Sequence, residues 1–308
     1  MFEYDVIIPV YKPDSEFKKM IQALARQTWK ARKIILVNTD KSCFDTAYDE
    51  EDVKKWADYI ELHHVTKAEF DHGATRNYGV SLGNSDFFVC MTDDAIPADD
   101  YLMEHLLSRF RDESVGIAYA RQLPREDCGI IERYTRTFNY PEQSSVKSAE
   151  DLATIGIKAF FASNVCAAYR RKYFKELGGF PEHTIFNEDM IYARHLIDAG
   201  YRIAYEAGAR VIHSHNYSGI QQFHRNFDLG VSHGEYPEVF GNVKTQSEGI
   251  RLVKQTGKYV CGIGKPWLLI KLIWQSGWKF LGYSLGKRFQ KLPRGLVIKC
   301  SMNKKYWK

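Results

Sequence analysis

The chain has 308 residues, of which 44% are hydrophobic and 26% charged, and this composition suits a globular protein with one large core. Six cysteines lie far apart without a Cys-x-x-Cys pair, which argues against disulfides and zinc sites and predicts reduced thiols in the cytosol. The start, MFEYDVIIPV, lacks the basic region of a signal peptide, and no apolar stretch reaches about 18 residues, so we expect no membrane span.

The net charge of +5 is unevenly distributed. Residues 244–308 contain fifteen Lys or Arg and one acid, Glu248, so this segment carries +14 and the preceding residues carry −9. Such a split predicts an acidic body with a basic segment that contacts an anionic surface, either a membrane or a nucleic acid. No nucleic-acid recognition fold accompanies the basic residues, so we expect a membrane and no nucleic acid.

Strand and helix patterns alternate along the chain. We expect strands at residues 5–10, 34–37, 59–65, 87–91, 116–120 and 209–215, and helices at 15–27, from about 73, at 99–110 and after Asn187. The polar and aromatic stretch 121–148 shows little periodicity, and we interpret it as an excursion over the site. The alternation predicts an α/β fold with a parallel sheet.

Two adjacent carboxylates, Asp93 and Asp94, follow the apolar run Phe87–Met91. Like charges at the mouth of a sheet repel each other, and oxygen ligands suit Mg²⁺ or Mn²⁺, so the pair predicts a divalent metal site. The alternative is that both acids cap the helix expected near Asp99 or lie in a solvated loop.

Polar and aromatic residues follow the first two strands. Pro9 and Tyr11 end the first, and Asn38 and Asp40 follow the second. The carboxyl ends of parallel strands form one crevice, and a ring with an amide or acid suits a nucleobase and ribose. The alternatives are loop packing for Tyr11 and turn chemistry for Asn38 and Asp40. No GxGxxG or P-loop motif is present, which argues against dinucleotide cofactors and P-loop hydrolases.

Two further stretches carry polar residues that the sequence singles out. Arg76 and Asn77 lie at the start of a helix, where free N–H groups and a guanidinium favour a diphosphate. A surface salt bridge is the alternative for Arg76. Ser163 and Asn164 interrupt the apolar run 160–169, and core hydrogen bonding is the alternative for them.

Acids and imidazoles recur in the second half of the chain. Glu188 and Asp189 lie in the first turn of a helix whose expected cap is Asn187, so an ionised carboxylate there is a candidate general base. His213 and His215 alternate at a strand end and face the same side, where an imidazole could complete the metal site at Asp94. The alternatives are helix capping for the acids and packing for the histidines.

The basic segment contains an amphipathic helix over residues 265–285. Apolar residues form one stripe, and Lys271, Gln275 and Lys279 form the opposite one. The apolar stripe comprises Trp267, Ile270, Trp274, Trp278, Leu281 and Leu285. This pattern predicts an interfacial anchor on an anionic leaflet. The alternative is a helix packed on the catalytic core with a solvated basic face.

The chain as a whole resembles the family-2 glycosyltransferases of the GT-A fold, in particular the bacterial rhamnosyltransferase branch. The resemblance is carried by VIIPVYKP, FDHGATRNYG, MTDDAIPAD, ARQLPR with FNYP, FFASNVCAAYRR with LGGFP, NEDMIYARHLIDAGYRIAYEAGARVIHSHNYS, and KLPR with SMNKKYW. It implies a mostly parallel Rossmann-like sheet flanked by helices, over residues 1–217. Residues 1–100 would bind the nucleotide and 101–217 the acceptor, and 218–308 would form a helical basic extension.

The resemblance also implies an activity and residue roles. The reaction would be an inverting transfer of L-rhamnose from dTDP-β-L-rhamnose to a glycan or lipid-linked glycan, with Mn²⁺ or Mg²⁺. Asp94 and His213, or His215 instead, match metal ligands, and Asp189 matches the base supported by Glu188. The positions that match nucleotide-sugar contacts are Pro9, Tyr11, Asn38, Asp40, Arg76, Asn77 and Asp93, and we add Asn164. The protein would act in the cytoplasm at the inner face of the plasma membrane; a homodimer stays open.

The sequence departs from the family at two positions and leaves rival functions. Asn38 stands where the family usually has Asp, and Asp93 where the branch often has Gln, which bear on nucleotide choice and metal preference. The rivals are transfer from another donor such as a UDP-hexose, a nucleotidyltransferase, and a non-catalytic membrane-associated glycan-binding protein. A nucleotidyltransferase needs a glycine- and basic-rich first loop, where this chain has only Lys12.

Overall fold

The computed structural model describes residues 2–48, 51, 55, 58–241, 243 and 246–307; Lys244 and Lys308, the ends of the basic segment, lie outside them. The strands are β1 (Tyr4–Val10), β2 (Lys33–Thr39), β3 (Ile60–Val65), β4 (Phe87–Met91), β5 (Ile96–Pro97), β6 (Val115–Leu123), β7 (Ser145–Lys147), β8 (Cys166–Arg170) and β9 (Arg202–Ile212). The helices of the first two thirds are α1 (Ser15–Arg26), α2 (Lys41–Ala47), α4 (His72–Leu82), α5 (Leu102–Ser108), α6 (Ile130–Asn139), α7 (Leu152–Ile155), α8 (Arg171–Glu176) and α9 (Glu188–Asp198). The last third contains α10 (Gly219–Glu235), α11 (Pro237–Phe240), α12 (Gln246–Gly262), α13 (Leu268–Gly286) and α14 (Arg294–Cys300).

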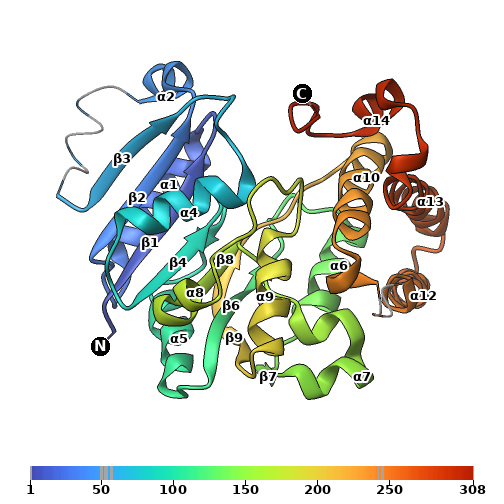
Figure 1. Ribbon diagram of the computed structural model, residues 1–308. Helices are drawn as coiled ribbons and strands as arrows, with labels where there is room; N and C mark the ends of the chain where they lie inside the picture. Colours follow the sequence, from blue (N-terminus) through green and yellow to red (C-terminus); the bar gives the residue numbers. More distant parts are fainter. Residues whose placement is uncertain are drawn as a thin grey trace.

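The described strands form one sheet in the order β3-β2-β1-β4-β8-β6-β9-β5, and β7 pairs with β9 (Figure 1). β1, β2, β3 and β4 run parallel to one another, as do β6 and β9, so the mostly parallel sheet is confirmed. β8 runs antiparallel between β4 and β6. Its amino end therefore lies at the same edge as the carboxyl ends of β1, β2 and β4, and the loop before β8 reaches the expected crevice.

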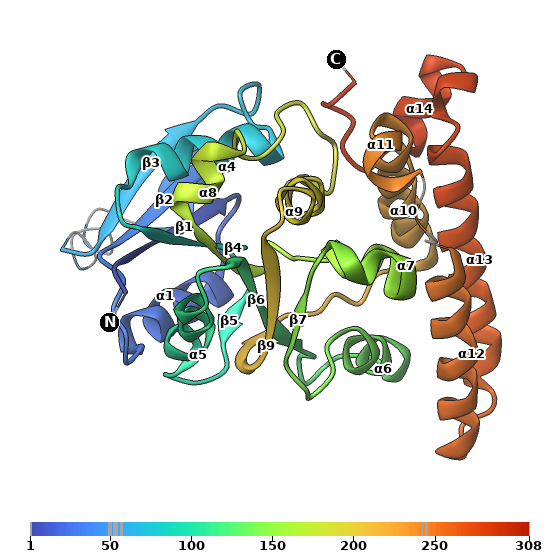
Figure 2. The same cartoon turned by 60° about the horizontal axis from the view of Figure 1, so that its bottom comes forward.

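Two apolar cores cover the two faces of the sheet. α1 and α5 pack on one face, with Phe17 and Leu106 fully buried, and α4, α8 and α9 pack on the other, with Ile191 fully buried (Figure 2). Strands covered on both faces become continuous apolar runs, which is why β1 and β4 were readable from sequence. The free thiols of Cys90 and Cys166 lie in these buried strands.

Several helices and strands begin or end at residues other than those that the sequence predicted. The helix expected at 99–110 begins at Leu102, because Asp99 accepts the N–H of Tyr101 at 2.9 Å and pairs with Arg210 at 2.7 Å. Within the apolar run 160–169 the strand begins at Cys166, after a loop. The excursion over 121–148 was expected to lack periodicity, yet it contains α6, whose Ile131 is buried.

The C-terminal helices pack beside the sheet domain, with α10 between α9 and α13 (Figure 2). α13 approaches α10 closely because its contact residues include glycines. A Cβ on Gly282 would lie 2.3 Å from the Phe223 carbonyl oxygen, and one on Gly286 would lie 2.0 Å from that of Phe227. None of the described helices is both long and apolar enough to cross a bilayer. The division into domains at residue 217 stays a prediction.

The face that α13 presents to solvent differs from the expected one. Lys279 was expected on a solvated stripe, but it is partly buried, while Ile273 and Phe280 are exposed. The exposed apolar residues of α13 and the turn before it are Trp267, Ile270, Ile273, Trp274, Phe280 and Leu281, hereafter the α13 apolar face. Helical periodicity defined the helix, but it could not tell which side would meet α10.

Candidate active site

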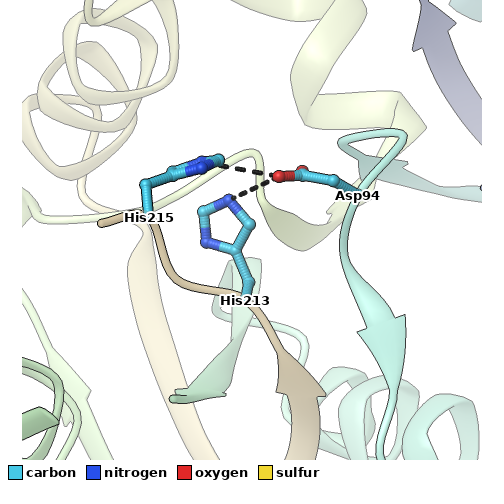
Figure 3. Close-up of side chains that lie close together, drawn as sticks. All are labelled: Asp94, His213 and His215. Atoms are coloured by element: carbon cyan, nitrogen blue, oxygen red, sulfur yellow. Dashed lines mark ion pairs between the residues drawn. The ribbon is translucent and has the colours of Figure 1, made fainter. Parts of the chain in front are cut away.

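Three potential metal ligands converge at the carboxyl edge of the sheet. Asp94 follows β4, and His213 and His215 follow β9. The Nε2 atoms of His213 and His215 lie 3.5 and 3.4 Å from Oδ2 of Asp94, and Figure 3 shows both rings pointing toward it. One carboxylate and two imidazoles are a donor set that suits a divalent ion such as Mn²⁺. The cluster fits the predicted metal site, and it includes both histidines.

Burial and a hydrogen bond set the state of the imidazoles. Burial lowers the pKa of His213 to about 3, although Asp94 opposes the shift, and burial also lowers the pKa of His215. Nδ1 of His213 lies 3.1 Å from Oε1 of Gln122. That oxygen can only accept, so Nδ1 carries the proton and Nε2 keeps its lone pair. A neutral imidazole oriented in this way is the form that binds metals.

The acidic pair lies at the start of α9. Nη1 of Arg76 lies 3.1 Å from Oε1 of Glu188. Although burial opposes it, Arg76 holds the pKa of Glu188 below its ordinary value. Asp189 accepts the N–H of Asn164 at 2.9 Å. Burial and then the neighbouring Glu188 raise the pKa of Asp189 to about 7, which suits a general base at neutral pH.

The expected N-cap residue of α9 does not cap the helix with its side chain. Asn187 occupies the N-cap position, but it has a φ of 66° and its side chain makes no capping hydrogen bond. Its Nδ2 instead donates to Oγ of Ser232 on α10 at 3.2 Å. The side chain therefore ties the acidic turn to the C-terminal helices, and sequence grammar predicted only its position.

The loop before β8 connects the acidic pair with the metal ligands. Nε2 of Gln122, the residue bonded to His213, donates to Oγ of Ser163 at 3.1 Å. The next residue, Asn164, donates its Nδ2 to Oε1 of Glu188 at 3.1 Å. The potential metal ligands and the acidic pair are thus parts of one hydrogen-bonded site. For the buried Asn164, the expected alternative of core hydrogen bonding matches the structure, and its contact with a donor stays a prediction.

A polar pocket lies where β2 and β3 end. It has a volume of about 330 Å³ and is lined by Asp40, Lys41, His64, Val65, Thr66 and Lys67. The buried Asn38 has Nδ2 3.0 Å from Nδ1 of His64, and its Oδ1 has no hydrogen-bond partner among the described residues. Lys67 forms an ion pair with Asp40 and holds the pKa of Asp40 down to about 2.

Tyr11 and Asp93 join this pocket to the metal ligands. The N–H of Tyr11 donates to Oδ2 of Asp93 at 3.0 Å, and the exposed Tyr11 ring lies 5.9 Å from Nζ of Lys67. Burial raises the pKa of Asp93 to about 6, and the adjacent Asp94 adds to this shift. Pro9 lies on β1, in register with Val37 of β2, so the expected nucleotide residues of the first two strands share one edge.

Comparisons with known proteins identify the family. The family described as Glycosyl transferase family 2 matches residues 5–178. The chain is 39% identical to the O-antigen chain rhamnosyltransferase RfbN of Salmonella typhimurium, over 98% of this chain and 95% of that protein. It is 38% identical to the O-antigen chain rhamnosyltransferase WbaN of Salmonella anatum, over 100% of this chain and 96% of that protein. The chain belongs to glycosyl transferase family 2.

Solved structures share the fold of this glycosyltransferase. A mannosyltransferase from Pyrobaculum calidifontis, in complex with GDP-Man and Mn²⁺, aligns with a TM-score of 0.57 at 15% identity, over 97% of this chain and 79% of that one. The structure of S. aureus TarS residues 1–349 in complex with UDP-GlcNAc aligns with a TM-score of 0.52 at 12% identity, over 94% of this chain and 91% of that one. The expected GT-A fold is confirmed, and family membership removes the nucleotidyltransferase and non-catalytic alternatives.

Two expected nucleotide residues of this glycosyltransferase make other contacts. Arg76 is buried, and its Nη1 donates to the His72 carbonyl at 2.9 Å besides its contact with Glu188. The ion pair is therefore buried, and the surface salt bridge considered from sequence is wrong. Asn77 donates to the Phe180 carbonyl at 2.9 Å and accepts its N–H at 3.0 Å. Arg76 thus connects α4 with the first residue of α9, Asn77 holds the loop before α9 at Phe180, and any diphosphate contact stays a prediction.

Gln122 is a site residue that sequence reasoning missed. It is buried at the carboxyl end of β6, where it orients His213 and also accepts a hydrogen bond from Arg136 of α6. The signal that could have identified it is its position: it is the Gln of ARQLPR, a polar residue directly after the apolar run of a strand. Because the excursion after β6 was interpreted as irregular, nothing indicated that its start faces the metal ligands.

Proposed function

We propose that this glycosyltransferase is an inverting, metal-dependent rhamnosyltransferase that moves L-rhamnose from dTDP-β-L-rhamnose to a lipid-linked cell-surface polysaccharide. The observation that carries the proposal is the coverage of the two O-antigen rhamnosyltransferases, which match nearly the whole chain at 39% and 38% identity. Such coverage extends beyond the family match over residues 5–178 and includes the C-terminal helices. The departures at Asn38 and Asp93 bear on the donor, so a UDP-hexose is the alternative.

Asp189 is the proposed general base. Its pKa of about 7 lets it accept a proton from an acceptor hydroxyl at neutral pH, and the N–H of Asn164 fixes the orientation of the carboxylate. The deprotonated oxygen attacks the anomeric carbon on the face opposite the nucleotide, so the configuration inverts. Glu188, paired with Arg76, keeps its charge and raises the pKa of Asp189. No covalent enzyme intermediate is needed.

Asp94, His213 and His215 are the proposed ligands of Mn²⁺ or Mg²⁺. A bound divalent ion would supply charge neutralisation for the leaving diphosphate. Gln122 orients His213 for this role through the Nδ1 proton. The pocket lined by Asp40, His64 and Lys67 is the proposed nucleoside site, with the exposed ring of Tyr11 near Lys67 and the buried Asn38 behind His64.

The α13 apolar face supports a membrane partner. Trp267, Ile270, Ile273 and Trp274 are between 63% and 77% exposed, which is unusual for adjacent large apolar side chains. Exposed cations flank them: Lys254 and Lys258 on α12, and Lys271, Lys287 and Arg288 on or beside α13. Apolar burial combined with attraction to anionic lipid suits the inner face of the plasma membrane, where the protein would meet a lipid-linked acceptor from the cytoplasm. A homodimer stays a prediction.

A transfer screen tests the donor and the metal together. The purified protein is incubated with dTDP-β-L-rhamnose, UDP-glucose, UDP-galactose or GDP-mannose, with and without Mn²⁺, and with lipid-linked oligosaccharide as the acceptor. We expect an α-rhamnoside that forms only from dTDP-β-L-rhamnose and only with the ion. Transfer from a UDP-hexose alone, or a product of retained configuration, would contradict the proposal.

A further inference from the structure

Arg225 of α10 lies beside both halves of the candidate active site. Its Cζ is 4.7 Å from the ring centroid of Phe186 and 5.7 Å from that of Tyr217. Tyr217 stacks on His215, with ring centroids 5.0 Å apart, and Phe186 immediately precedes the Asn187–Asp189 turn. The guanidinium therefore contacts the segment that carries the metal ligands and the segment that carries the acidic pair.

Lys279 of α13 adds a second cation from the C-terminal helices. Its side chain is partly buried one turn before Gly282, at the close contact of α13 with α10. Burial lowers the pKa of Lys279, Glu132 opposes the shift, and Arg136 and Arg225 add to it. The charge of Arg225 also acts on the imidazoles of the metal cluster. Lys279 is therefore near Arg225, and Arg225 is near the potential metal ligands.

Neither cation forms an ion pair within the part of the chain that the structure describes. Among the described residues, the side chains of Arg225 and Lys279 make no hydrogen bond or ion pair, whereas the adjacent Arg136 donates to Oε1 of Glu132 at 2.9 Å. Partly desolvated cations without a directly bonded anion are costly, and a bound anion offsets that cost. The arrangement is that of a site prepared for an anionic group.

We propose that Arg225 and Lys279 form an anion subsite that binds a diphosphate group beside the metal ligands. The inference rests on the proposed function, in which a sugar leaves a nucleoside diphosphate. A divalent ion leaves part of the charge of a diphosphate uncompensated, and two further cations would complete the compensation. The family match ends at residue 178, so α10 and α13 supply this subsite from outside the matched region.

Two molecules could bring the diphosphate: the nucleotide of the donor and a lipid diphosphate that carries the acceptor. The test measures binding by calorimetry in Mn²⁺ buffer, with the full chain as wild type, Arg225→Gln, Arg225→Lys and Lys279→Gln. The probes are dTDP against dTMP for the donor, and farnesyl diphosphate against farnesyl monophosphate for the acceptor. Arg251→Gln on α12 is the matched control, because it removes one charge from a residue that pairs with Glu248 away from the site.

We expect Arg225→Gln and Lys279→Gln each to lower the affinity for one diphosphate probe by at least about tenfold. The affinity for the matching monophosphate should fall by less than about twofold. A tenfold loss is the loss expected when one charge-assisted hydrogen bond is removed. Arg225→Lys should retain most of the affinity. Loss with dTDP assigns the subsite to the donor, and loss with farnesyl diphosphate alone assigns it to the acceptor. If both variants bind both diphosphates with wild-type affinity, the inference is overturned. The proposed function is still supported in that case, provided that the wild type binds dTDP. If the wild type binds no nucleoside diphosphate, both fall.

Discussion

The backbone N–H of Asn164 donates a hydrogen bond to Oδ2 of Asp189 at 2.9 Å. Because this donor is part of the main chain, the orientation of the proposed base depends on the path of the loop before β8. The side chain of Asn164 fixes that path, since its Nδ2 donates to Glu188 at 3.1 Å and its Oδ1 accepts from the Tyr169 hydroxyl at 2.7 Å. The loop and the acidic turn thus hold each other in position.

Asn164→Ala should lower kcat by about one to two orders of magnitude and leave the Kd of dTDP nearly unchanged. The variant removes one hydrogen bond from Oε1 of Glu188, which keeps its contact with Arg76, and it leaves the buried Tyr169 hydroxyl without its acceptor, which costs about 1–3 kcal/mol. Tyr169→Phe is the matched control, because it removes one hydroxyl and keeps the Glu188 contact. Wild-type kcat in Asn164→Ala would contradict the positioning role. Steady-state kinetics and nucleotide calorimetry provide both readouts.

Activity should depend on pH through Asp189, whose pKa is raised to about 7. A general base acts only when deprotonated, so kcat should fall about tenfold per pH unit below that value. The raised pKa also means that the folded protein holds this proton to higher pH than the unfolded chain. The carboxyl therefore lowers stability as pH rises from about 4 to about 7, and Asp189→Asn should be more stable than wild type at pH 8. A kcat that is constant from pH 5 to 8 would argue against this base.

Metal affinity should depend on the orientation of His213. Gln122→Leu removes the acceptor for the Nδ1 proton and should weaken Mn²⁺ binding by about 10- to 100-fold, whereas His213→Ala removes a ligand and should weaken it more. His105→Gln, on the exposed side of α5, is the control. Electron paramagnetic resonance of Mn²⁺ measures the free ion directly. Equal affinity in His213→Ala and wild type would exclude this cluster as the metal site.

Membrane binding should depend on the α13 apolar face. Ile270→Glu and Trp274→Glu each remove a large exposed apolar side chain worth on the order of 2 kcal/mol of burial, so both should weaken binding to vesicles that contain anionic lipid. Tyr101→Glu, at an exposed ring beside α5, should leave binding unchanged. Vesicle sedimentation gives the bound fraction. If both α13 variants bind as wild type does, this face is not the membrane contact.

The contact between α10 and α13 gives a stability prediction with an internal control. A Cβ on Gly286 would lie 2.0 Å from the Phe227 carbonyl oxygen, so Gly286→Ala should lower the free energy of unfolding by about 1–3 kcal/mol. On the same helix, nothing lies within 4 Å of a Cβ on Gly277, so Gly277→Ala should raise stability by about 0.5–1 kcal/mol. Urea denaturation compares them. If both variants changed the free energy of unfolding in the same direction, the described packing of α13 on α10 would be contradicted.

Part of this architecture was predictable because local chemistry decides it. Continuous apolar runs predicted β1, β2 and β4, and the polar residues after them predicted the edge at which the candidate site lies. The antiparallel direction of β8 was not predictable, since a strand's own residues do not encode its partners. That direction brings Asn164 to the acidic pair, and the sequence offered only a polar interruption of an apolar run.

The candidate site residues also fall into two groups, those that local sequence predicted and those whose contacts depend on packing. Asp94, Asp189 and His213 carried a readable signal in their position after strands or at a helix start. Arg76 also pairs with the buried Glu188, which its position near a helix N-terminus did not indicate, and its contact with a diphosphate stays a prediction. Packing between helices likewise decided which side of α13 became exposed.

The most direct test of the account compares wild type and Asp189→Asn in one assay with dTDP-β-L-rhamnose, Mn²⁺ and a lipid-linked acceptor. The account predicts rhamnosyl transfer by the wild type, a loss of kcat of about two to four orders of magnitude in the variant, and equal dTDP affinity for both. Transfer by Asp189→Asn at the wild-type rate would contradict it.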